Sequence, residues 1–180
     1  MLKKKLKTIG EFRKELKEAG WKKIGSGVFA RVYCNKEHPG VVMKVAEEDK
    51  AYHLYAKWCM KNQDNPYVPK IFSHEKIELA YEDEWQFKLT ITMMERLRPL
   101  RVAKGFKKLD AWEIKVGLGA GWSSGWDEAE ALKKATDPHV RKLGKYFIRA
   151  EERNEFRIDL HDGNVMMRGD TPVYTDPLCS

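Results

Sequence analysis

The chain has 180 residues and carries 34 Lys and Arg against 27 Asp and Glu, so its formal net charge is +7. Hydrophobic residues make up 42% of the sequence and charged residues 34%, which excludes collagen-like, low-complexity and largely disordered chains. No apolar run approaches the roughly 18 residues of a membrane span, and the first five residues lack the apolar stretch of a secretory signal. We therefore expect one soluble, cytoplasmic domain with no membrane partner.

The charge is concentrated at the N-terminus. Residues 1–24 hold nine Lys or Arg and three Glu, a net charge of +6. No aromatic residue alternates with these lysines in the way that a base-stacking platform requires. The segment therefore predicts a solvated helix face, and we expect no direct nucleic-acid binding.

The first half predicts a small antiparallel sheet with helices. Thr8 and Glu11 have the spacing of a capping box, Gly20 is a natural stop, and residues 8–19 between them have amphipathic helical spacing. Five strands are expected at 21–24, 28–34, 41–45, 70–78 and 86–94, with the turn of the first hairpin at Gly25-Ser26-Gly27 and a helix over 48–62.

The second half predicts helices and one late hairpin. Residues 101–125 are expected to be irregular apart from a helical turn near 110–116, and a short helix is expected over 127–135. Asp137 and Pro138 then form a cap and first helical residue, followed by an apolar face. That face comprises Val140, Leu143, Phe147 and Ala150. The overall class is α+β.

The late hairpin holds the residues that most clearly indicate chemistry. Strands at 165–167 and 173–175 around a turn at 168–172 would place Asn164 opposite Asp176. An amide oxygen beside a carboxylate suits Mg²⁺. Asp159, five residues before Asn164, is then free to accept a proton.

The early hairpin and the strand after it supply the complementary features. A glycine-rich turn lets backbone N–H groups approach anionic oxygens. Gly25, Ser26 and Gly27 precede Val32 in this hairpin, and Lys44 is an isolated cation in the next, apolar strand.

In this order, the motifs resemble the protein-kinase-like fold. Residues 25–32 are similar to its glycine-rich loop, 42–44 to its lysine-bearing strand, and 157–164 to its catalytic loop. More narrowly, Asp-Leu-His-Asp-Gly-Asn at 159–164 with Thr-Asp-Pro at 175–177 resembles the early serine/threonine kinases of short-tailed lytic bacteriophages. Those kinases phosphorylate host transcription and RNA-processing proteins during takeover.

The resemblance implies an organisation and a set of roles. A basic helix at 1–20 would precede a nucleotide-binding lobe at 21–97 and a reduced catalytic lobe at 98–180. ATP would contact residues of the early hairpin, its neighbouring strand and a hinge, namely Gly25, Ser26, Gly27, Val32, Lys44, Glu95 and Leu97. Asp159 would be the base, Lys44 would pair the phosphates, and Asn164 and Asp176 would hold Mg²⁺. Host proteins would be the substrates.

Several features depart from that pattern and leave alternatives open. Residues 50–63 hold no acid that could pair with Lys44, His161 is more typical of aminoglycoside-type phosphotransferases, and only four residues follow Asp176. A small-molecule phosphotransferase and a non-enzymatic kinase-like binder therefore remain alternatives. The Gly-x-Ser-x-Gly match at 121–125 follows a poor strand, so we interpret it as a chance match.

Overall fold

The structure of the chain, a computed structural model, is a mixed α+β arrangement with an antiparallel sheet, as the sequence predicts. It describes residues 8–27, 29–47, 49–81, 85–101, 105–118, 126–153 and 156–179. The described residues include five α-helices and form two compact units. Unit 1 comprises Met1–Asp49 and Ile71–Arg96, and unit 2 comprises Lys50–Lys70 and Leu97–Ser180. No helix in the described ranges is long and apolar enough to cross a bilayer.

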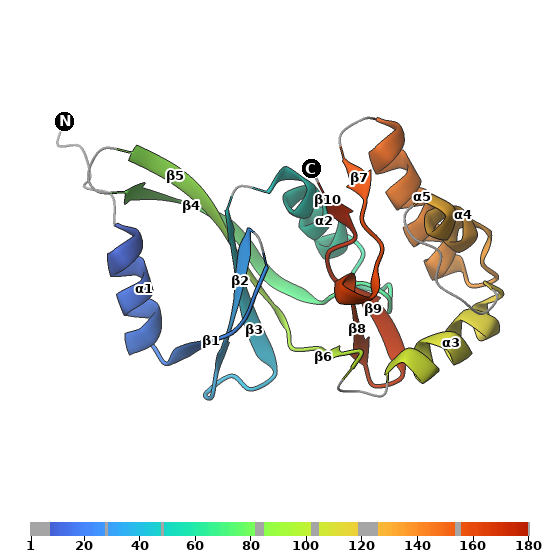
Figure 1. Ribbon diagram of the computed structural model, residues 1–180, viewed down its shortest axis with the longest axis horizontal. Coiled ribbons are helices and arrows are strands. Elements are labelled where there is room, and N and C mark those ends of the chain that lie inside the picture. The colour runs from blue at the N-terminus through green and yellow to red at the C-terminus, as the bar shows by residue number, and fades with distance from the viewer. Residues whose placement is uncertain are drawn as a thin grey trace. The chain divides into compact units, whose positions relative to one another are not determined.

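Unit 1 is built on a five-stranded antiparallel sheet (Figure 1). Its strands pair in the order β1-β2-β3-β5-β4. Their bounds are β1 Trp21–Ser26, β2 Ala30–Asn35, β3 Val41–Glu47, β4 Ile71–Tyr81 and β5 Trp85–Glu95. All five expected strands are therefore present, and most are longer than the sequence indicated.

The helix before the sheet, α1, spans Ile9–Glu18 and begins at a capping box. The Thr8 hydroxyl accepts from the Glu11 N–H at 3.2 Å, and the Glu11 carboxylate accepts from the Thr8 N–H at 2.7 Å. Gly20 follows the helix with a φ of 79°, a left-handed conformation that glycine adopts without strain. The predicted helix is confirmed. It could be predicted because the signals at both of its ends are local.

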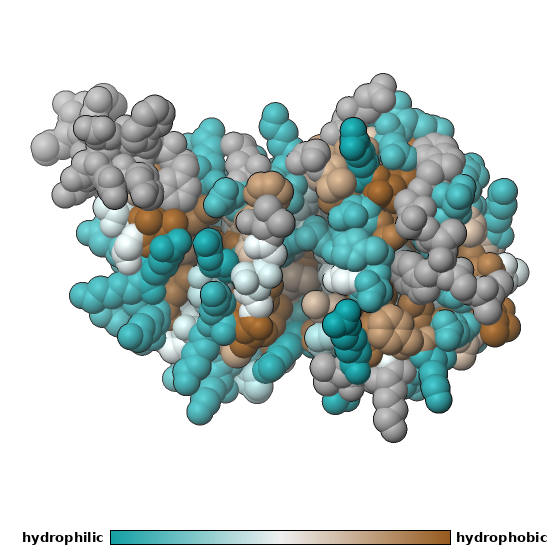
Figure 2. Space-filling model, in the orientation of Figure 1, coloured by the Kyte–Doolittle hydropathy of each residue, from teal (hydrophilic) through white to brown (hydrophobic). Residues whose placement is uncertain are grey.

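Helix α1 covers one face of the sheet. Leu16 packs there with Met43 and Val45 of β3 and with Leu79 and Leu89 of β4 and β5. In Figure 2 hydrophilic side chains predominate on the visible surface over α1, with hydrophobic ones beside it towards the sheet. Because neighbouring residues along a strand point to opposite faces, Lys44 lies on the face that α1 does not cover.

The first hairpin differs from the expected one in its turn. Strand β1 continues through Gly25 and Ser26, with an irregularity in register between Lys23 and Gly25. The hairpin closes where the Gly27 N–H donates to the Ala30 carbonyl at 2.8 Å. The predicted turn at 25–27 was therefore placed too early, because the bulge lets the glycine continue the strand.

Unit 2 contains α2 (Lys50–Met60), α3 (Gly105–Val116), α4 (Trp126–Lys134) and α5 (Pro138–Glu152). Asp137 caps α5 by accepting from the N–H groups of His139 and Val140 at 2.7 and 3.2 Å. The predicted apolar face of α5 is buried as expected. The helical turn expected near 110–116 is present as part of α3, but the helix is longer than expected, with 12 residues, and it buries Leu109, Trp112 and Val116. The Gly-x-Ser-x-Gly match and the acidic turn at 82–84 lie outside the described residues.

Residues 50–70 belong to unit 2 although they stand between two strands of unit 1 in the sequence. The Tyr55 hydroxyl donates to the Tyr174 carbonyl at 2.6 Å, and the Asn65 amide donates to the His139 carbonyl at 3.0 Å. The Arg168 guanidinium donates to the carbonyls of Pro66 and Val68 at 2.7 and 2.9 Å. These bonds attach α2 and the loop after it to the C-terminal half of the chain.

The late hairpin of unit 2 consists of β8 (Val165–Arg168) and β9 (Thr171–Tyr174), and β6 (Arg98–Pro99) pairs with β8 on its other side. A second short pair joins β7 (Arg157–Ile158) to β10 (Leu178–Cys179), and a 3-10 turn spans Asp162–Asn164.

The register of this hairpin is shifted by one residue from the prediction. Val165 pairs with Tyr174 rather than with Thr175. The reason is a two-residue turn, Gly169-Asp170, in which Gly169 adopts a φ of 63°. Pro172 consequently lies inside β9, where it is tolerated because β9 is an edge strand. Asn164 therefore faces Thr175, and the expected pairing of Asn164 with Asp176 was wrong.

Candidate functional site

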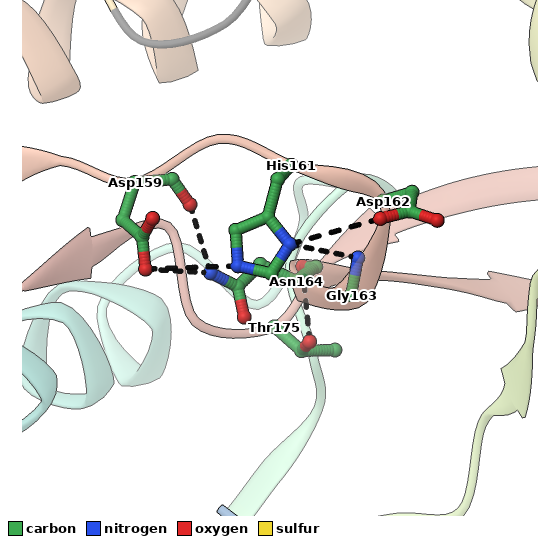
Figure 3. Close-up of polar contacts among 6 residues, drawn as sticks. All are labelled: Asp159, His161, Asp162, Gly163, Asn164 and Thr175. Atoms are coloured by element: carbon green, nitrogen blue, oxygen red, sulfur yellow. Dashed lines mark hydrogen bonds and ion pairs between the residues drawn. The ribbon is translucent and has the colours of Figure 1, made fainter. Parts of the chain in front are cut away.

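The candidate site of unit 2 is the loop from Asp159 to Asn164, which follows β7 and ends in the 3-10 turn (Figure 3). The Asn164 N–H donates to the His161 carbonyl at 2.9 Å and so closes the turn. The Asp159 N–H donates to the Pro177 carbonyl at 2.9 Å, which continues the pairing of β7 with β10. Both ends of the loop are thus anchored to main chain.

The side chains of Asp159 and Asn164 meet directly. The Asn164 amide nitrogen donates to the Asp159 carboxylate at 3.0 Å and to the Asp159 carbonyl at 2.8 Å (Figure 3). Because both bonds use the amide nitrogen, the amide oxygen of Asn164 faces away from the carboxylate and keeps its lone pairs. The Asp159 side chain is 43% exposed, so its carboxylate is open to an incoming group.

Thr175 anchors Asn164 from the other side of the hairpin. Its N–H and its hydroxyl both donate to the Asn164 carbonyl, at 2.8 and 3.0 Å. Sequence reasoning missed this residue because it expected Asp176 in that place. The sequence did contain a signal for this role, because a threonine can donate a hydrogen bond from its hydroxyl in addition to the one from its backbone N–H.

Asp176 is placed by its two neighbours. Thr175 is bonded to Asn164, and the Pro177 carbonyl accepts from Asp159. The half-buried Asp176 therefore stands between the two main-chain contacts that hold Asn164 and Asp159. All three predicted oxygen-bearing residues are brought to one end of the hairpin, although the predicted register was wrong.

His161 lies between two carboxylates. Its Nδ1 accepts the Gly163 N–H at 3.0 Å, which in a neutral ring leaves the proton on Nε2. Nε2 is 3.8 Å from an oxygen of Asp159, and Nδ1 is 3.8 Å from an oxygen of Asp162 (Figure 3). The ring edge that bears the proton therefore faces the candidate base.

The remaining predicted residues lie in unit 1 or at its boundary. Gly25 pairs with Val32, Val32 with Lys44, and Lys44 with Thr92, so these residues form one row across the sheet. Lys44 is only 8% exposed. Ser26 and Gly27 lie at the open end of the first hairpin. The row is on the face opposite α1.

The expected hinge coincides with the boundary of the two units. Glu95 is the last residue of β5, and the Arg96 N–H donates to the Gly40 carbonyl at 2.8 Å. Leu97 begins the second segment of unit 2, ahead of β6. The Lys44 row and the Asp159–Asn164 loop thus belong to different units.

A buried pair of acids in unit 2 was not foreseen from the sequence. Glu113 of α3 is 2% exposed and Glu128 of α4 is 4% exposed. Burial, together with the nearby Glu113 charge, raises the pKa of Glu128 to about 7. Burial and the charges of both acids also raise the pKa of Tyr174 on β9 well above its ordinary value. No sequence signal distinguishes these two glutamates from solvated ones.

A scan against models of known protein families finds no match, and no curated protein matches the chain significantly.

Proposed function

We propose that this chain is an ATP-dependent phosphotransferase with a protein-kinase-like fold, and that it phosphorylates serine or threonine in host proteins, as the bacteriophage kinases that its motifs resemble do. The observation that carries the proposal is the pair of hydrogen bonds that the Asn164 amide donates to the carboxylate and the carbonyl of Asp159. It fixes a potential base and a potential metal ligand in one rigid loop.

In this proposal Asp159 orients the acceptor hydroxyl and takes its proton. A base must lie within hydrogen-bond reach of that hydroxyl, and the exposed Asp159 carboxylate is held in one orientation by Asn164. The contact with Asn164 leaves the charge of Asp159 in place, because the amide is neutral.

The donor set near Asp159 fits Mg²⁺. The Asn164 amide oxygen and the Asp176 carboxylate are hard oxygen ligands at the same end of the hairpin. Magnesium in phosphotransferases is held by one or two such groups together with the phosphates of its nucleotide. Mg²⁺ would neutralise charge on the transferring phosphoryl group. The residues present would place it next to Asp159.

The arrangement of unit 1 supports a nucleotide site on the sheet face that α1 leaves uncovered. The open hairpin end at Ser26 and Gly27 and the ammonium group of Lys44 belong to that one sheet. A Cβ atom added at Gly27 would meet no other atom within 4 Å, so there is space beside the hairpin end for a phosphate. Lys44 would pair the phosphates electrostatically.

The test uses two matched aspartates of the same loop. Asp159→Asn keeps the bond from Asn164 but removes the base, and we expect it to lower transfer from labelled ATP by roughly a hundredfold or more. Nucleotide affinity should be unchanged. Asp162→Asn is the control, because Asp162 is similarly exposed, at 48%, and equally far from His161. If Asp159→Asn transfers phosphate as fast as Asp162→Asn does, the proposed role of the loop is wrong.

A second candidate is transfer to a small molecule, favoured by His161. Its Nε2 faces Asp159, and the Asp-Leu-His-x-Gly-Asn pattern resembles aminoglycoside-type phosphotransferases. Incubation with labelled ATP, Mg²⁺ and a bacterial lysate separates the two. Label in protein bands supports the kinase, and label in small metabolites supports this alternative. No label alongside intact nucleotide binding would favour a non-enzymatic binder.

A further inference from the structure

Two stretches of unit 2, which contain α2 and all of α5 except its last two residues, Glu151 and Glu152, are rich in positive charge. Residues 50–63 and 138–150 contain seven Lys or Arg and no Asp or Glu. Their net charge of +7 compares with +6 for residues 1–24, so the chain has two basic regions and its remaining residues are net acidic. The first stretch contains α2 and the second contains most of α5.

The two helices meet at a pair of stacked rings. The ring centroids of Trp58 on α2 and Tyr146 on α5 are 4.3 Å apart, with an angle of 16° between the ring planes. Both residues are half-buried, whereas Tyr55, which contacts both rings, is only 1% exposed. The stack therefore lies at the outer edge of the contact between α2 and α5.

Three cations flank this stack. Residues three or four positions apart on a helix share a face, so Lys142 and Arg149 lie beside Tyr146. Lys61 directly follows α2, and its N–H donates to the Trp58 carbonyl at 3.1 Å. All three cations are exposed. We name these five residues the α2–α5 seam.

One face of the Trp58 indole is left without a ring partner. Tyr55 is 6.3 Å from Trp58 and nearly parallel to it, yet Tyr55 and Tyr146 are only 6.1 Å apart. Rings stacked on opposite faces of Trp58 would be at least about 7 Å apart, twice the stacking separation. Tyr55 and Tyr146 therefore do not cover opposite faces, and no other described ring contacts Trp58.

We infer that the α2–α5 seam binds single-stranded nucleic acid. In this inference Lys61, Lys142 and Arg149 contact phosphates, and a base stacks on the face of Trp58 that no described ring covers. Cations beside an aromatic platform are the combination that binds single strands without sequence preference. An acidic polypeptide would match the charge but has no regular series of flat groups for the indole. This inference departs from the expectation of no direct nucleic-acid binding, which was argued from residues 1–24 alone and did not consider this surface. The inference does not rest on the proposed phosphotransfer.

The experiment measures the binding of a fluorescently labelled oligonucleotide of about 12 nucleotides, within the usual range of site sizes, by anisotropy over a range of salt concentrations. Replacing Lys61, Lys142 and Arg149 by Ala should weaken binding roughly tenfold or more and reduce the slope of log affinity against log salt by about 2, since each phosphate contact contributes about 0.7. The matched control replaces Arg13, Lys14 and Lys17 of α1, which are equally exposed. An equal loss in the control would show general charge attraction and overturn the inference.

Variants of Trp58 distinguish binding of nucleic acid from binding of other polyanions. Trp58→Ala should weaken binding of the oligonucleotide at least about fivefold but leave binding of an abasic strand of the same length unchanged. Trp58→Phe keeps a stacking ring and most of the packing on Tyr146, so it should retain binding even if the Ala variant folds poorly. Equal affinity for the two strands, or for polyglutamate, would refute a nucleic-acid site.

Discussion

Gly163 has no side chain at a position where a Cβ atom would lie 2.7 Å from Cε1 and 3.0 Å from Nδ1 of His161. The backbone N–H of the same glycine donates to that Nδ1. The imidazole can therefore lie flat against the turn only because residue 163 is glycine. This contact fixes the ring edge that faces Asp159.

We predict that Gly163→Ala forces the His161 ring to rotate away. The lost hydrogen bond should lower the free energy of unfolding by about 1 kcal/mol, and the ¹⁵N resonance of His161 Nδ1 should lose the signature of an accepting nitrogen. The double variant with His161→Ala should show little further loss of stability, because the clash is then absent. If the double variant instead lost as much stability as the two single variants added together, the ring and the glycine would not interact.

Thr175 is expected to hold Asn164 through its hydroxyl as well as its backbone. Thr175→Val removes the 3.0 Å hydroxyl bond but keeps the shape of the side chain and the 2.8 Å N–H bond. We expect a loss of about 1 kcal/mol in chemical denaturation. Thr175→Ser should retain the bond and most of the stability, so equal losses for Val and Ser would contradict this role.

Asp176 is predicted to act through Mg²⁺. Asp176→Asn should weaken nucleotide binding roughly tenfold or more in the presence of Mg²⁺, because charge-assisted ligation is lost. Binding measured with EDTA should be nearly unaffected. Isothermal titration of wild type and variant across Mg²⁺ concentrations is the measurement. Unchanged affinity at every concentration would remove Asp176 from the metal site without affecting the predicted role of Asp159.

The buried Glu128 makes stability depend on pH. Its folded pKa of about 7 is above the ordinary 4.5, so the folded state holds the proton more tightly than the unfolded state does. The stabilisation is therefore complete below pH 4.5 and is lost as pH rises through about 7. By pH 8 the difference amounts to about 3 kcal/mol, at about 1.4 kcal/mol per pKa unit.

Glu128→Gln should flatten this dependence, as judged by urea unfolding at pH 5 and pH 8. Glu130→Gln is the control on the same helix, since Glu130 is bonded to Lys133 at 2.6 Å instead of facing Glu113. A wild-type slope as flat as that of Glu128→Gln would show that the carboxyl is already ionised at pH 5.

The parts of this fold that were predictable are those that local chemistry determines. The Thr8–Glu11 box and the Asp137 cap each act within one turn of helix, so the spacing of two residues is enough to locate them. Strand β3 was identified by its β-branched residues alone. The meeting of Asp159 with Asn164 was predictable in the same way, because the two residues are only five positions apart.

The parts that were not predictable depend on choices between similar local structures or on burial. Arg168-Gly169-Asp170-Thr171-Pro172 permits either a two-residue or a longer turn, and a shift of one residue exchanges Asp176 for Thr175 opposite Asn164. Helix α3 lacks a capping signal, and its buried Glu113 reads as a solvent-facing residue. The row of Val32, Lys44 and Thr92 could be expected only once the strand pairing was known.

The attachment of α2 to residues far along the chain has a consequence for synthesis. Tyr55 and Tyr174 are 119 positions apart, yet their hydrogen bond is buried in unit 2. While the ribosome is still making the helical half, Ala51, Tyr52 and Cys59 have no completed core in which to pack. Contacts between such distant residues form slowly. In a nascent chain the apolar side chains of α2 would therefore stay exposed, and accessible to chaperones, until β9 has been synthesised.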